Sequence, residues 1–209
     1  MPAASDKDQR LRRYWDRHAR SYDRQMSFFD RMLFGESRRW ICSRAGGRVL
    51  EVAIGTGLNL PLYPDDVELT GLEWSPAMLD IARRRADELG RAADLRVGDA
   101  QALPFDDASF DTVVATLSLC AIPDEERAVA EMVRVLRPGG RLLLLDHVIA
   151  SAWPARALQR LLELVTVPLG GEHFRRRPLR HVEAAGLRIE ERDRFKLGIV
   201  ERIAARKPA

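Results

Sequence analysis

Residues 48–60 read RVLEVAIGTGLNL, an apolar run that contains one acid and ends in two glycines separated by a single residue. The run is typical of a buried strand, and Gly55 and Gly57 permit a tight turn and a close approach of the backbone to a ligand. We expect this turn to lead into a helix whose N-terminus exposes unpaired N–H groups. A dinucleotide fingerprint needs a third small residue at position 60, where this chain has Leu60. The stretch therefore predicts a strand–turn binding site that is not a dinucleotide site.

From Arg48 to His147, short apolar runs alternate with segments of helical periodicity. The predicted strands are 49–53, 68–73, 94–98, 111–117 and 141–147. Ser75 and Asp124 are placed to cap two intervening helices. Two further alternating runs, 187–195 and 198–207, predict an antiparallel hairpin at the sheet edge. The sequence thus predicts an α/β fold, a Rossmann-like, doubly wound, mostly parallel seven-stranded sheet with an antiparallel C-terminal edge hairpin.

The length of 209 residues suits one domain with a small cap. We expect residues 1–45 to form an N-terminal helical cap or lid, and residues 46–209 to form the main domain, with a helical insertion at 150–180 on the substrate side. Cys42 and Cys120 lie far apart, which favours buried free thiols over a disulfide or a zinc site. The N-terminus lacks the apolar core of a signal peptide, so we expect a cytoplasmic protein.

The net charge of +3 is unevenly distributed. Residues 1–48 hold 12 Lys and Arg against 6 Asp and Glu, residues 49–150 hold 9 against 18, and residues 151–209 hold 13 against 7. Basic flanks around an acidic middle suit an anionic partner such as lipid headgroups. Solvated helix faces explain the same pattern. Peripheral contact with the inner face of the membrane through these flanks is therefore an open alternative.

The residues that follow the predicted strands carry the chemistry, because ligands bind beyond the carboxyl ends of such strands. Glu73 follows the second strand at a spacing that suits hydrogen bonds to ribose hydroxyls. After the third strand, Asp99 suits an exocyclic adenine amine, with the N–H of Ala100 beside it. The backbone at 116–118, after the fourth strand, suits a ligand amine. Together these four strand ends indicate a nucleoside-like ligand.

The chain resembles the class I S-adenosylmethionine-dependent methyltransferases over residues 48–147. The resemblance rests on EVAIGTG (51–57), GLEWSPAML (71–79), VGDAQALPF (97–105), SFDTVVATLSLC (109–120) and LRPGG (136–140). It departs from the family at Ala53, where the pattern usually has glycine. The resemblance implies S-adenosylmethionine as the cofactor, with Glu51 and the 53–57 backbone holding its amino acid portion. It also places Leu117 near the amine of that portion.

The complete set of predicted cofactor-binding residues is Glu51, Ala53, Gly55, Thr56, Gly57, Asn59, Glu73, Trp74, Met78, Asp99, Ala100 and Leu117. His147, at the end of the fifth strand, is the predicted proton acceptor for an amine substrate. Tyr22 is predicted to close over the cofactor from the cap. Methyl transfer from a sulfonium needs no metal, and we predict none.

The flanks resemble the small-molecule and lipid branch of the family. SYDRQMSFFDR (21–31) is similar to ubiquinone/menaquinone-biosynthesis methyltransferases, and residues 117–148 are more similar to phosphatidylethanolamine N-methyltransferases and membrane-associated thiol methyltransferases. The favoured acceptor is a phosphatidylethanolamine-like amine, with a quinone precursor or a thiol as alternatives. Three other functions are considered: an NAD(P)-dependent oxidoreductase, a nucleic-acid methyltransferase and a binding module without catalysis. We expect no nucleic acid partner. Either a monomer or a homodimer fits.

Overall fold

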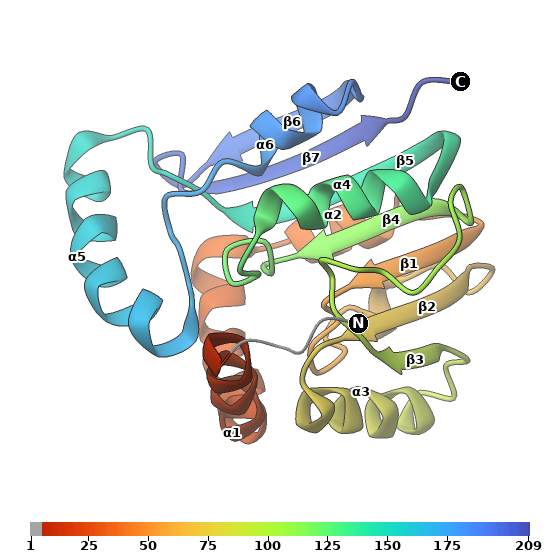
Figure 1. Ribbon diagram of the computed structural model, residues 1–209, viewed down its shortest axis with the longest axis horizontal. Helices are drawn as coiled ribbons and strands as arrows, with labels where there is room; N and C mark the ends of the chain where they lie inside the picture. Colours follow the sequence, from red (N-terminus) through yellow and green to blue (C-terminus); the bar gives the residue numbers. More distant parts are fainter. Residues whose placement is uncertain (1–5) are drawn as a thin grey trace.

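The computed structural model describes residues 6–209 and contains a seven-stranded sheet flanked by helices (Figure 1). The strands are β1 (Arg48–Val52), β2 (Glu68–Glu73), β3 (Asp94–Val97), β4 (Phe110–Thr116), β5 (Leu136–His147), β6 (Arg188–Phe195) and β7 (Val200–Arg206). The helices are α1 (Asp6–Phe29), α2 (Ser37–Cys42), α3 (Pro76–Glu88), α4 (Glu125–Val135), α5 (Trp153–Gly170) and α6 (Pro178–Ala184). A π-helical turn, η1 (Asp30–Phe34), continues α1. Residues 1–5 of the predicted cap lie outside the described residues.

The strand order is β3-β2-β1-β4-β5-β7-β6. Neighbours among β1 to β5 pair in parallel, whereas β7 pairs antiparallel with both β5 and β6. The predicted doubly wound sheet with its antiparallel C-terminal hairpin is therefore confirmed. The chain order reverses between β1 and β4, which opens a crevice beyond their carboxyl ends.

Buried apolar side chains form a core layer on each face of the sheet. Leu142 and Leu144 of β5 lie in the layer that α4 and α6 cover, and Leu143 and Leu145 lie in the layer that α2 and α3 cover. Successive side chains of a strand point to opposite faces, so an unbroken leucine run suits a strand that is covered on both sides. The two cysteines are buried free thiols, as predicted.

The predicted helix caps are present. The Ser75 side chain accepts a hydrogen bond from the Met78 N–H at the start of α3, and Asp124 accepts one from the Arg127 N–H at the start of α4. Each bond satisfies one of the free N–H groups of a first helical turn. Because α3 starts just after β2, its cap also fixes the backbone beside the crevice.

The helix expected after the glycine turn is wrong. Only a three-residue 3-10 turn, η2 (Leu60–Leu62), follows β1 before the chain enters β2. Pro61 lies within this turn and Pro64 follows it. Pro61 lies in the first turn, where proline is tolerated, but in a longer helix the ring of Pro64 would clash with the Leu60 carbonyl, and Pro64 has no N–H to donate to it. Pro64 therefore prevents a longer helix. The end of β1 is therefore followed by a turn and not by the N-terminus of a longer helix.

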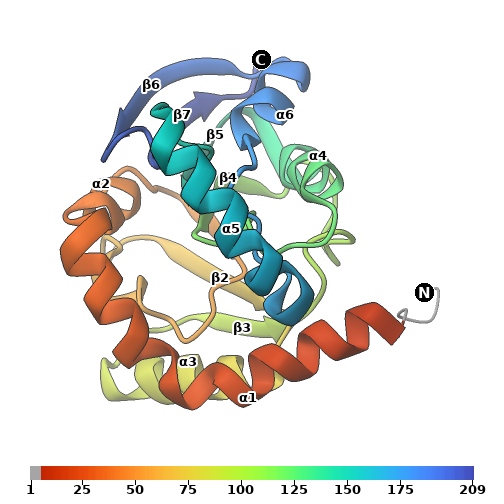
Figure 2. The same cartoon turned by 90° about the vertical axis from the view of Figure 1, so that its left-hand side faces the viewer.

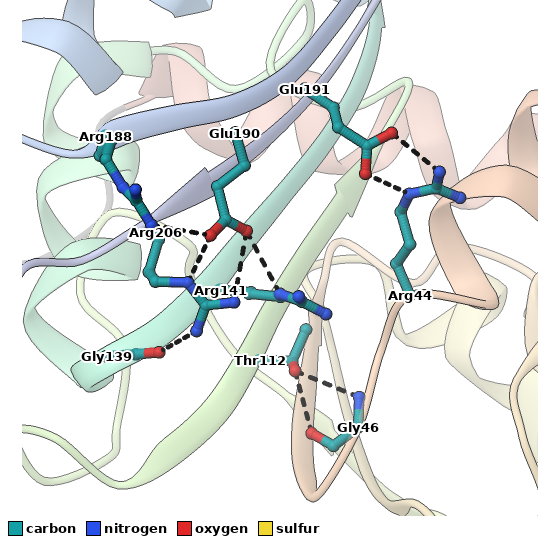
Figure 3. Close-up of polar contacts among 9 residues, drawn as sticks. All are labelled: Arg44, Gly46, Thr112, Gly139, Arg141, Arg188, Glu190, Glu191 and Arg206. Carbon is teal, nitrogen blue, oxygen red and sulfur yellow. Dashed lines mark hydrogen bonds and ion pairs between the residues drawn. The ribbon is translucent and has the colours of Figure 1, made fainter.

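The outer strand β6 is held by a charge network at a bulge (Figure 3). Glu190 is the extra residue of the bulge, and the register with β7 shifts around it. Its carboxylate contacts three arginines, Arg141 at 3.4 Å, Arg188 at 3.2 Å and Arg206 at 2.5 Å. The neighbouring Glu191 pairs with Arg44, beyond α2, at 2.9 Å. The hydrogen bonds from these arginines lower the pKa of both carboxyl groups.

Helix α1 passes along the carboxyl end of the sheet, as the predicted N-terminal cap requires (Figure 2). Two aspartates attach it there. The Asp16 carboxylate accepts a 2.5 Å hydrogen bond from the Ser75 hydroxyl, and Asp23 accepts one of 2.5 Å from the Thr56 hydroxyl. Asp23 also pairs with Arg85 of α3 at 2.5 Å. Helix α1 is thus bonded to the turn after β1 and to the start of α3. None of the helices in residues 6–209 has the length and apolar composition needed to cross a membrane.

Candidate active-site cleft

A cleft lies at the carboxyl ends of the central strands, with α1 along one side, and it holds about 820 Å³ of empty space including its open mouth. Most of the predicted site residues line it. These are Tyr22, Ala53, Gly55, Thr56, Glu73, Trp74, Met78, Asp99, Ala100 and Leu117. They come from four strand ends, from the first turn of α3 and from α1, so the fold brings together side chains that are far apart in the sequence. Glu51, Gly57, Asn59 and His147 do not line the cleft.

The two glycines of the turn have different surroundings. A Cβ atom added to Gly55 would meet nothing within 4 Å, so this glycine leaves its backbone open. A Cβ atom added to Gly57 would lie 2.6 Å from the Leu60 side chain and 3.2 Å from Ala82 of α3. Leu60 is therefore packed against Gly57, in the core beneath the turn. Only the first glycine of the pair borders the ligand space.

Two non-glycine residues at the cleft have left-handed backbones. Ala53 follows β1 with φ of 56° and Leu117 follows β4 with φ of 52°. A residue with a Cβ atom pays about 1 kcal/mol for this conformation, and glycine does not. The glycine that the family pattern usually has at position 53 is thus explained by the turn. The Leu117 N–H donates a 2.7 Å hydrogen bond to the Leu145 carbonyl, which ties the second turn to β5.

The acid after β2 is buried and bonded to the turn after β1. One Glu73 oxygen accepts a 2.9 Å hydrogen bond from the Gly55 N–H, and the other accepts one of 2.8 Å from the Ser75 N–H. Burial raises the pKa of Glu73, while these N–H donors favour its charged form. Each carboxylate oxygen has more than one acceptor site, so both can still receive hydroxyl groups of a ligand.

The wall after β3 and β4 offers further polar groups. Asp99 is half-buried and accepts hydrogen bonds from the backbone N–H and the side-chain amide of Gln101, at 2.9 and 3.0 Å. The Ser118 hydroxyl is buried in the cleft lining and has no hydrogen-bond partner among the described residues. An orphaned buried hydroxyl is uncommon in a folded protein, so this one indicates a polar ligand. The cleft therefore fits a ligand with hydroxyl, amine and carboxylate groups.

A buried polar cluster lies beneath the turn. The Glu51 carboxylate accepts hydrogen bonds from the Asn59 amide at 2.7 Å and from the Tyr63 hydroxyl at 2.9 Å. Asn59 also donates to the Thr116 hydroxyl at 2.9 Å and accepts from Arg38 at 3.1 Å. Burial raises the pKa of Glu51 to about 7 despite these donors. Glu51 and Asn59 thus support the cleft from below, and Arg38 connects them to its lining.

Helix α1 contributes two aromatic rings to the lining, Trp15 and Tyr22. Their ring centroids are 6.3 Å apart in an edge-on arrangement. Burial raises the pKa of Tyr22, so its phenol stays protonated and can donate a hydrogen bond but cannot accept a proton. Tyr22 lines the cleft, and its closing role stays a prediction.

His147 lies at the end of β5, outside the cleft lining. Its ring packs on Phe174 with a centroid distance of 4.7 Å, and its Nδ1 atom has no hydrogen-bond partner among the described residues. Burial lowers its pKa to about 4, so it is neutral at pH 7 but a weak base. The ligand atoms of Cys120, Asp146 and His147 lie within 4.8 Å of one another. Both Asp146 oxygens already accept backbone N–H groups, from His147 at 2.8 Å and Cys120 at 3.3 Å.

Sequence reasoning missed Trp15 and Arg38. The aromatic side chains within residues 8–45 are the available signal for Trp15. Arg38 gives no such signal, because it is one of 12 basic residues in the first 48. Its role depends on the fold, since α2 brings it against Asn59 and against Asp30 of η1 at 2.9 Å.

The chain has relatives among known methyltransferases. Residues 50–144 match a family model described as a methyltransferase domain. A phosphatidylethanolamine N-methyltransferase of Cereibacter sphaeroides is 43% identical over 127 residues, which cover 60% of this chain and 63% of the relative. A ubiquinone/menaquinone biosynthesis C-methyltransferase UbiE of Geobacter sp. (strain M21) is 29% identical over 94% of this chain and 88% of the relative. The crystal structure of a candidate methyltransferase from Bacillus halodurans C-125 has a TM-score of 0.71 and 21% identity, over 83% of this chain and 98% of that one.

The sheet order and the acid-lined cleft define a class I methyltransferase fold, and the Bacillus halodurans structure shares that fold. The methyltransferase-domain match, the named methyltransferase relatives and this fold together indicate a class I S-adenosylmethionine-dependent methyltransferase, as predicted, with S-adenosylmethionine as its cofactor. In the first three curated matches the chain covers 63%, 56% and 57% of the relative, which is less than two thirds of each. The acceptor of this chain is therefore the subject of a proposal.

Replacing Ala53 with glycine tests the strained turn. We expect Ala53→Gly to raise the free energy of unfolding by up to about 1 kcal/mol, because glycine adopts a positive φ at no steric cost. Urea denaturation at pH 7 measures this. The matched control is Ala185→Gly, at a residue with φ of −76°, which we expect to be neutral or destabilising. If Ala53→Gly destabilises the protein as much as the control, the explanation from φ fails.

The Glu51 carboxyl predicts a pH dependence of stability. Its folded pKa of about 7 lies above the unfolded value of about 4.3. Its stabilising contribution is therefore complete below the unfolded pKa and is lost as the pH rises through about 7. We expect the free energy of unfolding of the wild type to fall between pH 5 and pH 8, and Glu51→Gln to remove up to about 3 kcal/mol of that fall.

Urea denaturation at the two pH values measures this difference. Burial also raises the pKa of Asp146 to about 7, so part of the fall remains in the Glu51→Gln variant. Glu183→Gln, at an exposed residue of α6, is the control and should behave as the wild type. Equal pH dependence in Glu51→Gln and the wild type would contradict the assigned pKa.

Proposed function

We propose that this chain transfers a methyl group from S-adenosylmethionine to the amine of a phosphatidylethanolamine-like headgroup. The observation that carries this proposal is the 43% identity to a phosphatidylethanolamine N-methyltransferase over 60% of this chain. When bound, S-adenosylmethionine supplies an electrophilic methyl group. The protein contributes by holding the nucleophile close to this methyl group and in line with the bond that breaks, away from water.

The polar groups of the cleft support a model in which each strand end contacts a different part of the cofactor. In this proposal Glu73 accepts hydrogen bonds from the ribose hydroxyls. Asp99 accepts one from the adenine amine, with the buried Ala100 beside the ring. The turn at 53–57 and Leu117 hold the amino acid portion, because both present backbone to the cleft. Trp74 and Met78 supply apolar surface to the lining.

Arg38 is the proposed partner of the cofactor's carboxylate. It is the one basic side chain among the described lining residues, and it is 9% exposed. Hydrogen bonds to Asp30 at 2.9 Å and to Asn59 at 3.1 Å fix its guanidinium. A fixed guanidinium retains further donors that suit a carboxylate. Glu51 then acts through Asn59, as a positioning residue for Arg38.

An amine acceptor must lose one proton when it is methylated, so a proton acceptor is part of the proposal. His147 stays a prediction in this role; its place outside the cleft lining and its low pKa weigh against it. Glu172 also lies outside the lining, but burial raises the pKa of its carboxyl group, so it is a second candidate. Its charge raises the pKa values of Tyr14 and Tyr22 in α1, so it lies near the lid. Tyr22 keeps its predicted role of closing over the cofactor.

A second acceptor class is favoured by a different observation. The UbiE relative is similar over 94% of this chain, including the flanks that adjoin the cleft. This supports carbon methylation of a quinone precursor as the alternative. Sulfur methylation of a thiol, the oligomeric state and the contact of the basic flanks with a membrane remain predictions.

The acceptor is tested by mass spectrometry with S-adenosylmethionine that carries a deuterated methyl group. Phosphatidylethanolamine, a demethylated quinone precursor and an alkyl thiol are each supplied in detergent micelles. We expect one labelled methyl group on the phosphatidylethanolamine nitrogen and none on the other two. Label on the quinone precursor or the thiol alone would overturn the amine proposal. No label on any of the three acceptors would support the hypothesis that the protein is a binding module without catalysis.

Two variants control the assay. Asp99→Ala removes the proposed adenine contact, and we expect it to slow labelling about tenfold at low cofactor concentration, the loss of about one charge-assisted hydrogen bond. Asp87→Ala removes an exposed acid of α3 and should leave the rate unchanged. Equal rates in both variants would contradict the role of Asp99.

A further inference from the structure

Helix α5 turns two polar side chains toward the protein and most of its large apolar side chains away from it. Gln159 and Glu163 are only 4% and 9% exposed. Seven large apolar side chains of the same helix are between 44% and 75% exposed: Trp153, Leu158, Leu161, Leu162, Leu164, Val165 and Leu169. We call these seven side chains the α5 apolar face. A surface helix of a globular protein normally has the opposite arrangement.

Hydrogen bonds fix α5 in this orientation. The Gln159 amide accepts from the Ala150 N–H at 2.9 Å and donates to the carbonyls of Val148 at 2.8 Å and Phe174 at 3.0 Å. Glu163 accepts from the backbone N–H and the guanidinium of Arg175, at 2.9 and 2.6 Å. Rotation of the helix to bury its leucines would break these bonds and leave buried polar groups unpaired. The α5 apolar face is therefore held outward.

Helix α5, which carries the α5 apolar face, crosses the carboxyl end of the sheet (Figure 2). At its start, the Ser151 N–H bonds to the carbonyl of Leu197 at 2.9 Å, and the Leu197 side chain, in the β6–β7 turn, is 68% exposed. At its other end, Gly170 and Gly171 lie against Tyr14 and Leu11 of α1. An exposed apolar surface of this extent marks an interaction site.

The chain that follows α5 is hydrogen-bonded to a segment that lines the cleft. The His173 N–H donates to the Cys120 carbonyl at 2.8 Å, and Arg176 donates to the Pro123 carbonyl at 3.1 Å. The segment 118–123 that receives these bonds contributes four residues to the cleft lining, Ser118, Ala121, Ile122 and Pro123. The α5 apolar face therefore lies on the side of the molecule where the cleft opens.

The charges beside the α5 apolar face are basic. Arg156 and Arg160 are exposed on α5, and Lys196 is exposed next to Leu197. Within α5, all of which is described, the one acid is Glu163, which points inward and pairs with Arg175. An apolar helix face with flanking arginines suits the surface of an anionic bilayer. Two copies of the face would instead bring arginines together without an acid on α5 to pair them.

We propose that the α5 apolar face docks on the surface of a bilayer that contains anionic phospholipid, so that the mouth of the cleft faces the lipid headgroups. This docking also names the bilayer as the source of the methyl acceptor, and that one point rests on the proposed function. Binding to the bilayer needs no methyl transfer. The leucines enter the headgroup region while the polar side of α5 stays bonded to the protein.

Sedimentation with vesicles tests the docking. The vesicles contain phosphatidylcholine and phosphatidylglycerol and no phosphatidylethanolamine, so the assay does not depend on the acceptor. We expect the wild type to sediment with them, and the double variant L161E/L164E to bind at least tenfold more weakly, because two leucines no longer enter the lipid. The control is Leu89→Glu, which places one of these two charges at a 48% exposed leucine at the end of α3. It should bind as the wild type.

Three results would overturn the docking: no binding of the wild type at low salt, equal binding of the double variant, or equal loss in the control. The wild type could instead fail to bind vesicles and form a dimer in sedimentation velocity, while L161E/L164E stays monomeric. That result would make the α5 apolar face a self-association surface. Far-ultraviolet circular dichroism and the affinity for S-adenosylhomocysteine check that each variant is folded.

The docking and the proposed function fail separately. Methylation of phosphatidylethanolamine in detergent micelles without binding to vesicles would remove the docking and keep the function. Binding to vesicles without methylation of any acceptor would remove the proposed function and keep the docking. If both hold, L161E/L164E should lose activity on phosphatidylethanolamine in vesicles and keep it on the same lipid in micelles.

Discussion

The parallel pairing of β1 with β4 is the constraint on which the cleft depends. The register from Val49 opposite Thr112 to Val52 opposite Ala115 brings both strands to an end at the same level. Each strand is followed within a residue by a left-handed turn, at Ala53 and at Leu117, so both chains bend away from the crevice between them. The strand order reverses at this pair, and the helices on the two sides therefore leave the crevice open. The remaining parts of the site are attached to this frame.

The polar groups around this frame form two levels. The lower level is the cluster of Glu51, Asn59 and Tyr63, which is closed by its own hydrogen bonds. The upper level contains Glu73 and the unpartnered Ser118 hydroxyl, which still have capacity for a ligand. This division explains why a buried acid with a raised pKa can sit in the motif without lining the cleft. The lower level holds the turn and Arg38 in place, and the upper level meets the ligand.

Much of the fold is predictable from the sequence because its signals are local. The leucine run of β5, the Ser75 and Asp124 caps and the alternation in β6 and β7 each follow from backbone geometry that a few neighbouring residues determine. The strand ends place Glu73 and Asp99 in the cleft by the same logic. The helix expected after the glycine turn is wrong because Pro64 cannot continue the helical turn that begins at Leu60.

Other features depend on contacts between distant segments. The sequence pattern of α5 indicates an amphipathic helix but not which side faces the protein; that is decided by Gln159 and Glu163, whose partners lie before and after the helix. The place of Arg38 in the lining, and that of His147 outside it, depend in the same way on how α2 and the segment around Phe174 fold back. Such contacts leave no local sequence signal.

The central claim is that the cleft between β1 and β4 is built for S-adenosylmethionine and not for a dinucleotide. Isothermal titration calorimetry with S-adenosylhomocysteine and with NADH tests this directly. The account predicts that S-adenosylhomocysteine binds at one site per chain with a micromolar or lower Kd, and that NADH gives no saturable heat and does not compete. Saturable binding of NADH, with no response to S-adenosylhomocysteine, would contradict it.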